Sequence, residues 1–93
     1  MINAKQKEFI LETLSEYKPK SVGVFGSYAR GENTSTSDLD ILVDFENTPD
    51  LLEIIGIEQK MTEKLGIKVD LITTRSLHSS LKVYVEKDLI ALA

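Results

Sequence analysis

The sequence contains no cysteine, so it can form neither a disulfide nor a thiolate metal site, which is compatible with a reducing cytoplasm. It also lacks any apolar stretch near the ~20 residues that cross a bilayer, and its first residues do not resemble a signal peptide. Basic side chains are in the minority, with 11 against 15 acidic ones and a formal charge of −4. This balance argues against nucleic-acid binding, which is driven by neutralising phosphates. We expect a soluble, cytoplasmic protein that neither enters a membrane nor binds nucleic acid directly.

The chain is short, but its apolar content is enough for one modest core. Of its 93 residues, 42% are apolar, and they fall in periodic blocks. No repeat, linker or low-complexity tract divides these blocks. We therefore expect one domain over residues 1–93, with no second domain available to grip a large substrate.

Hydrophobic periodicity and turn residues predict a mixture of helices and strands. Asn3 and Gln6 have the spacing of a capping box, and Pro19 follows the helix that they begin. The predicted strands are residues 21–25, 39–45 and 67–73, the later helices are residues 28–30, 51–65 and 77–86, and residues 89–92 add an edge strand or dock as a turn. This order predicts an α/β fold, a small mixed sheet of three or four strands with helices packed mainly on one face.

The helix expected at residues 51–65 has two features that need an explanation. One member of its inward stripe, Glu58, is polar, and Gly56 lies in its interior, where glycine costs about 1 kcal/mol relative to alanine. Close packing against a neighbour is our hypothesis for Gly56. The N-cap is either Thr48, ahead of a proline, or Asp50, which has Glu53 three residues later. The stripe expected to face the core is Leu51, Ile54, Ile55, Glu58, Met61 and Leu65.

The stretch of residues 22–44 carries most of the functional information. An apolar run ends at Gly26 and Ser27, ten residues intervene, and Asp38 and Asp40 open a second apolar run. Strand side chains alternate between faces, so the two aspartates point the same way. Carboxylates held this close repel each other unless a cation separates them, and Mg2+ is bound by one or two carboxylates plus substrate phosphates. The glycine–serine turn offers N–H groups and a hydroxyl to a phosphate. These are the parts of a metal-dependent phosphoryl or nucleotidyl transfer site.

A third carboxylate, Asp70, lies inside an otherwise apolar predicted strand, where an unpaired charge is costly. If this strand lies beside the second one, Asp70 can join Asp38 and Asp40, and the three could hold two ions about 3.5–4 Å apart. The alternative is a surface acid on an edge strand, paired with Lys68 or Arg75. We expect the first two strands to be adjacent and antiparallel, because only that arrangement brings the turn back to the aspartates.

These motifs resemble a known family. The glycine–serine turn, the Asp-x-Asp pair, the later strand aspartate and the segments GSYARGE, SDLDILVDF and KVDLIT are similar to the minimal nucleotidyltransferases of the DNA polymerase beta superfamily. The resemblance covers nearly the whole chain. It implies that Gly26 and Ser27 hold the nucleotide's phosphates and that Asp38 and Asp40 bind the metal. It also implies that Asp70 helps to bind the catalytic metal and draws the proton from the attacking hydroxyl.

Several other residues have both a functional and a structural interpretation. Arg30 either reaches a nucleotide phosphate bidentately or pairs with Glu32 or an aspartate to brace the loop. Tyr28, next to the turn, either lines the nucleotide base or packs in the core, and Tyr84 is expected in the core or at its rim. His78, the only histidine, is expected to be a surface or cap residue because it has no partner in the sequence pattern.

The resemblance also implies a partner. Members of this family commonly act as the antitoxin of a helical HEPN ribonuclease toxin, and transfer AMP from ATP, with Mg2+, to a tyrosine of that toxin. An assembly of this chain with such a toxin is therefore expected, and the acidic balance suits docking on a more basic protein. The alternative is a non-catalytic module that neutralises the toxin by contact. A weaker option is transfer to a small molecule such as an aminoglycoside, for which longer relatives use an added helical domain.

Overall fold

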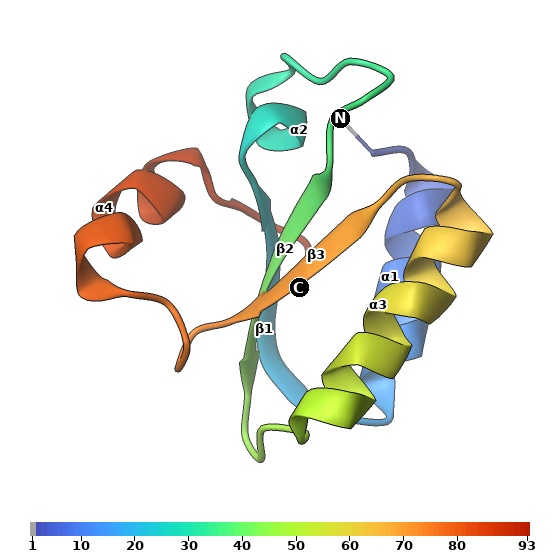
Figure 1. The fold of residues 1–93 in the computed structure, drawn as a ribbon, viewed down its shortest axis with the longest axis vertical. Coiled ribbons are helices and arrows are strands. Elements are labelled where there is room, and N and C mark those ends of the chain that lie inside the picture. Colours follow the sequence, from blue (N-terminus) through green and yellow to red (C-terminus); the bar gives the residue numbers. More distant parts are fainter. Residues whose placement is uncertain (1) are drawn as a thin grey trace.

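The computed structural model describes residues 2–93, which form a four-stranded sheet with helices on both of its sides (Figure 1). Most of the predicted elements are confirmed to within two residues of their bounds. In chain order the elements are α1 (Ala4–Ser15), β1 (Pro19–Phe25), α2 (Ser27–Arg30), β2 (Leu39–Phe45), α3 (Leu51–Leu65), β3 (Val69–Thr73), α4 (Ser79–Asp88) and β4 (Ile90–Ala91).

The sheet has the strand order β3-β2-β1-β4. Strands β1 and β2 are adjacent and antiparallel, as expected, and β3 lies parallel to β2. The tail forms the short edge strand β4, antiparallel to β1. The expected α/β fold with a small mixed sheet is therefore confirmed. Within residues 2–93, no helix combines the length and the apolar composition needed to cross a membrane.

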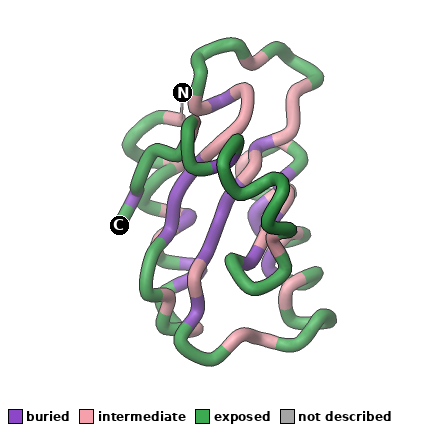
Figure 2. Tube along the Cα trace, turned by 90° about the vertical axis from the view of Figure 1, so that its left-hand side faces the viewer, coloured by how far each residue is buried: buried purple, intermediate pink, exposed green. Residues whose placement is uncertain are grey.

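The core lies between one face of the sheet and the two longest helices. Alternate residues of β2, such as Ile41 and Val43, are fully buried and share this face with Val24 of β1. Helices α1 and α3 contribute Leu14 and Met61 to the same cluster. Figure 1 shows these two helices together on one side, and α4 on the other, where only Val85 of that helix is buried. Figure 2 shows that burial follows the central strands and that exposed residues form the periphery.

The helix ends follow the capping chemistry of the sequence. Asn3 and Gln6 form the expected capping box at the start of α1. Asp50, rather than Thr48, caps α3, because its side chain accepts a hydrogen bond from the backbone N–H of Glu53 at 2.8 Å. Helix α2 begins at Ser27, one residue before the predicted start, and the glycine before it is the N-cap.

The expected inward stripe of α3 is partly wrong. Leu51 is 71% exposed and Ile55 is 38% exposed, whereas Ile57, which the stripe omitted, is buried. The helix is rotated relative to the predicted stripe, so that Ile57 and Met61, four residues apart, face the core. The hypothesis for Gly56 is also wrong, because an added Cβ would have no atom within 4 Å. Gly56 therefore lies on the solvent side of the helix and has no packing role.

The polar member of the stripe, Glu58, covers the open edge of the sheet. Strand β3 is an edge strand, and its outward N–H groups would otherwise lack partners. The N–H of Leu71 donates to Glu58 Oε2 at 2.7 Å, and the N–H of Val69 donates to Thr62 Oγ1 at 3.0 Å. Two side chains of α3 thus satisfy the strand that carries Asp70 and hold it in place.

Candidate functional site

A sharp turn at the end of β1 begins the site. Gly26 has φ 75° and ψ −153°, a backbone conformation that only glycine adopts readily. A Cβ on this residue would collide with Oδ2 of Asp40. Gly31, with φ 72°, ends the single turn of helix that follows. The turn therefore presents Ser27 at the start of a short helix, directly against a carboxylate of the next strand.

The register of the sheet places the predicted acids at one edge of the molecule. Asp40 is paired with Phe25, the residue before the turn, on one side and with Asp70 on the other. Asp40 and Asp70 therefore point to the same face of neighbouring parallel strands. Asp38 immediately precedes β2, and all three aspartates are half-buried. The structure thus places the three aspartates that sequence reasoning selected at the same end of the strands as the Gly26–Ser27 turn.

Burial and neighbouring acids raise the pKa of Asp40 and of Asp70. Burial raises the pKa of Asp40 above its ordinary 3.8, and the neighbouring charges of Asp70 and Asp38 raise it further, while Arg30 lowers it. Burial is also the largest cause of the raised pKa of Asp70, and a hydrogen bond with Asp38 raises this pKa further. Adjacent carboxylates that suppress each other's ionisation attract a cation or share a proton. This electrostatic arrangement is that of a cation site or of a proton acceptor.

The alternative for Asp70 was an ion pair with Lys68 or Arg75. Lys68 Nζ instead lies 3.7 Å from Oδ2 of Asp38, and the Lys68 side chain is 70% exposed. Lys68 lowers the pKa of Asp70, but less than burial and the hydrogen bond with Asp38 raise it. Asp70 is thus coupled mainly to the other acids of the site and not to a basic partner.

The donor set suits a hard divalent cation, since carboxylate oxygens are the ligands that Mg2+ takes. In the observed side-chain conformations, however, the acids interact in pairs, Asp70 with Asp38 and Asp70 with Asp40. Among residues 2–93, no three acidic or histidine side chains are already grouped so as to hold a metal ion. Binding one ion with Asp38, Asp40 and Asp70 together therefore requires at least one of them to change its rotamer.

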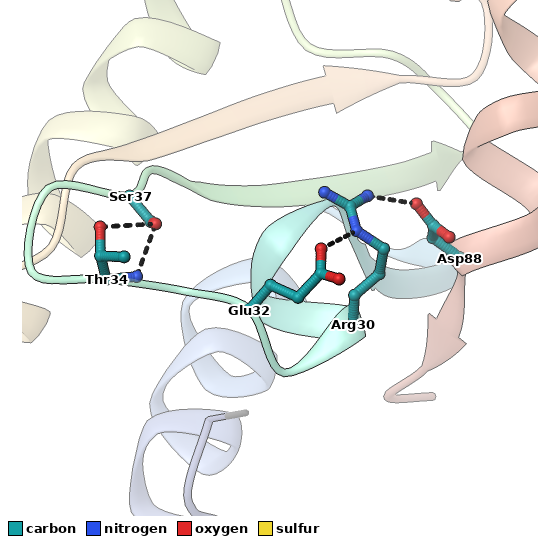
Figure 3. A network of polar contacts seen from close by, with 5 residues as sticks. All are labelled: Arg30, Glu32, Thr34, Ser37 and Asp88. Atoms are coloured by element: carbon teal, nitrogen blue, oxygen red, sulfur yellow. Dashed lines mark hydrogen bonds and ion pairs between the residues drawn. The ribbon is translucent and has the colours of Figure 1, made fainter.

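Arg30 forms two ion pairs (Figure 3). Its Nε donates to Glu32 at 2.7 Å, and its Nη1 donates to Asp88 at 2.6 Å. The first contact is the local brace that the sequence suggested. The second joins α2 to Asp88, the last residue of α4, 58 positions away. The sequence suggested an aspartate as a partner but did not indicate which one. In the loop before the acids, Ser37 Oγ accepts a hydrogen bond from the N–H of Thr34 at 2.8 Å, which shapes the approach to β2.

The structure assigns the remaining candidates to structural positions. Tyr28 is buried in the core cluster, so it is not exposed to a nucleotide base. His78 is the N-cap of α4, where its Nδ1 accepts a hydrogen bond from the N–H of Ser80 at 3.2 Å, which confirms the cap interpretation. Tyr84, expected in the core or at its rim, is 71% exposed.

An open groove of about 460 Å³ adjoins the acids, and sequence reasoning missed it. Its strand side contains Asp40, Asp70 and Ile72, and its helix side contains Leu81 and Tyr84 of α4. The groove could not be predicted because it depends on how α4 lies over the sheet. The only local signal was the series of apolar residues at positions 77, 81 and 84, which has helical spacing.

Fold and site together define an α/β nucleotidyltransferase. Residues 6–92 match the model of the nucleotidyltransferase domain family. The chain is 39% identical over 95 residues to the protein adenylyltransferase MntA of Thermococcus cleftensis, and the alignment covers 97% of this chain and 96% of that protein. The chain therefore belongs to the nucleotidyltransferase domain family.

Solved structures agree with this assignment. A toxin–antitoxin complex crystallised with AMP-PNP contains a chain that is similar to this one, with a TM-score of 0.86 and 29% identity over 94% of this chain and 72% of that one. The MNT antitoxin complex with the tri-AMPylated HEPN toxin of Shewanella oneidensis gives a TM-score of 0.79 and 26% identity, over 96% and 70% of the two chains.

Proposed function

We propose that this protein transfers AMP from ATP to a hydroxyl of a partner protein, a tyrosine of a HEPN-type toxin, and thereby acts as its antitoxin. The observation that carries the proposal is the pairing of Asp40 with Asp70 beside the Gly26–Ser27 turn. Phosphoryl-type transfer needs a phosphate cradle and charge neutralisation more than a covalent nucleophile, and this edge of the sheet offers both.

The proposal assigns a role to each residue of the site. The Gly26–Ser27 turn holds the β- and γ-phosphates through backbone N–H groups and the serine hydroxyl. Asp70 accepts the proton of the attacking hydroxyl, and in the metal-free protein burial raises its pKa. Asp38 and Asp40, with Asp70, would hold Mg2+, one or two ions, which supplies neutralising charge to the triphosphate. Arg30 braces α2 through Glu32 and Asp88, consistent with a positioning role.

The relatives support the partner in this proposal. The Thermococcus cleftensis relative is named a protein adenylyltransferase, and the HEPN toxin in the Shewanella oneidensis complex is tri-AMPylated. Residues 2–93 form one sheet with its helices, and in this proposal another protein supplies the acceptor hydroxyl. We therefore propose a hetero-oligomer of this chain with its toxin. Neutralisation by contact alone remains the competing function, and the catalytic acids distinguish the two.

The test is the double substitution Asp38→Ala with Asp40→Ala. Because both carboxylates act on the triphosphate, we expect AMP transfer from labelled ATP to the purified toxin to fall by at least about a hundredfold. Circular dichroism should show an unchanged fold, since two repelling charges are removed. The matched control is Asp44→Ala, an aspartate on the same face of β2 that lies outside the site. Toxin neutralisation by the double variant at the parent level, without transfer, would instead establish the contact mechanism.

A further inference from the structure

The geometry points to the groove between α4 and strands β2 and β3 as the subsite for the aromatic ring of the acceptor tyrosine. This inference rests on the proposed function and adds to it the place where the acceptor enters. The groove holds about 460 Å³ and is shared by Asp40, Asp70, Ile72, Leu81 and Tyr84. Its volume is in the range of small-molecule and side-chain sites, and it opens directly onto the acids.

The order of the site residues across the sheet indicates where ATP and the acceptor bind relative to each other. The turn lies at the end of β1, Asp40 follows on β2, and Asp70 follows on β3. In phosphoryl-type transfer the attacking and leaving oxygens lie roughly in line with the phosphorus. If the turn holds the leaving pyrophosphate, the acceptor must approach from the opposite side, which is the Asp70 side. The groove continues from Asp70 to Ile72 and then to α4, so it lies on the acceptor side.

The groove lacks the groups that a nucleotide would need. No lysine or arginine is among the described residues that line it, so it cannot neutralise a triphosphate. Two of its polar side chains, Ser76 and His78, already make local contacts. Ser76 Oγ donates to the carbonyl of Thr73 at 3.0 Å, and Nδ1 of His78 lies 2.8 Å from Oγ of Ser80. Most of the remaining lining is apolar, which suits an aromatic ring better than the polar edge of a base.

Those apolar walls are unusually exposed. Leu81 is 54% exposed and Tyr84 is 71% exposed, although both face the same groove. Phe25 adds an aromatic side chain from the end of β1. Aromatic pairs gain from edge-to-face or offset contact in addition to their buried area. A phenol ring placed between the sheet and α4 would cover these side chains and direct its hydroxyl toward Asp70.

The reaction at this subsite is balanced without any further reagent. The tyrosine oxygen forms a bond to the α-phosphorus of ATP, and the bond between that phosphorus and the oxygen bridging to the β-phosphate breaks. Pyrophosphate leaves with the electron pair of the broken bond. The phenolic proton passes to the carboxylate of Asp70, which lines the groove. Nothing is oxidised or reduced.

A kinetic comparison on α4 tests the inference. We expect Leu81→Ser to raise KM for the purified toxin roughly tenfold, because an apolar contact to the acceptor is lost. KM for ATP should stay unchanged. The matched control is Val83→Ser, a 70% exposed apolar residue of the same helix that does not line the groove, and it should leave both constants unchanged. A rise in KM for ATP with Leu81→Ser, or an equal effect of Val83→Ser, would overturn the inference.

A binding measurement keeps the inference separate from the proposed function. N-acetyl-tyrosine amide is titrated into the protein with Mg2+ and AMP-PNP while the methyl signals of Ile72, Leu77 and Leu81 are followed by NMR. We expect saturable shifts at these methyls that N-acetyl-alanine amide does not cause. Shifts confined to Leu51 and Leu52 of α3, or none at all, would overturn the acceptor subsite even if AMP transfer to the toxin is observed. Absence of transfer with shifts in the groove would instead overturn only the proposed reaction.

Discussion

At the scale of single residues, the site depends on Gly26, which forms the turn after β1 and lies against Asp40 of the next strand. Gly26 is required twice, once by its positive φ and once by the carboxylate of Asp40 that occupies the place of its side chain. The first requirement could be inferred from a glycine at a strand-to-helix turn. The second could not, because it depends on the register between β1 and β2.

Two glycine-to-alanine substitutions should therefore have opposite effects. We expect Gly26→Ala to lower the free energy of unfolding by about 1–3 kcal/mol, because alanine is strained at this φ and collides with Asp40. Gly56→Ala should raise it by up to about 1 kcal/mol, because Gly56 lies inside a helix with open space around it. Urea unfolding measures both. Equal effects of the two substitutions would contradict the difference between a required and a merely tolerated glycine.

At the scale of elements, the sequence predicted what local patterns encode and missed what packing decides. Strand β2 was predicted with its observed bounds, and the Asp50 capping box was among the expected alternatives. The inward face of α3 was misassigned because apolar residues occur on both sides of that helix and periodicity alone does not choose between them. The link from Arg30 to Asp88 joins helices that lie far apart in the chain, so no local pattern contains it.

Glu58 shows how a polar residue in an apolar stripe can serve a neighbouring element. Its carboxylate accepts the N–H of Leu71 on the open edge of β3. We expect Glu58→Ala to lower the free energy of unfolding by about 1–3 kcal/mol, because this half-buried N–H loses its partner. Glu58→Gln keeps an acceptor oxygen and should lose less. The measurement is urea unfolding of both variants, with Glu63→Ala, an exposed acid of the same helix, as the control.

The edge of β3 adds a second readout for the same variants. Unpaired strand edges promote association between chains. Glu58→Ala should therefore elute as larger species than Glu58→Gln in size-exclusion chromatography at matched concentration. Identical elution and identical unfolding of the two variants would show that the bond to Leu71 contributes nothing to the edge strand.

At the scale of the whole molecule, the site places destabilising charge in a protein that is already acidic. The formal charge is −4, and burial and neighbouring acids raise the pKa of Asp40 and of Asp70. An acid whose pKa is higher in the folded state than in the unfolded chain favours folding when protonated. The stability it contributes is present below the unfolded value and is lost as the pH rises through the folded value. Metal-free protein should thus lose stability from this site as the pH rises above about 4.

Comparison with Asp40→Asn isolates this contribution from all other titrations. In EDTA at pH 7, we expect Asp40→Asn to have a higher free energy of unfolding than the parent, because the variant removes a charge that burial and Asp70 disfavour. The difference should shrink as the pH falls toward 3.8, the ordinary pKa of the carboxyl, where the parent is also protonated. Urea unfolding at several pH values measures this difference. A variant that is less stable than the parent at pH 7 would mean that the charge of Asp40 stabilises the metal-free fold.

Mg2+ and AMP-PNP should make the parent protein more stable than Asp40→Asn, which reverses the order expected without them. A ligand that binds only the folded state adds about 2.7 kcal/mol at one hundred times its dissociation constant, which for a domain of this size raises Tm by on the order of 10 °C. With Mg2+ and AMP-PNP we expect the parent to gain this stability, because the cation then neutralises acids that repelled each other. Asp40→Asn, which lacks one ligand, should gain little. The three aspartates would thus lower the free energy of unfolding in the absence of Mg2+ and nucleotide and raise it when both are bound. Binding of the metal and the nucleotide therefore compensates for the repulsion between the acids.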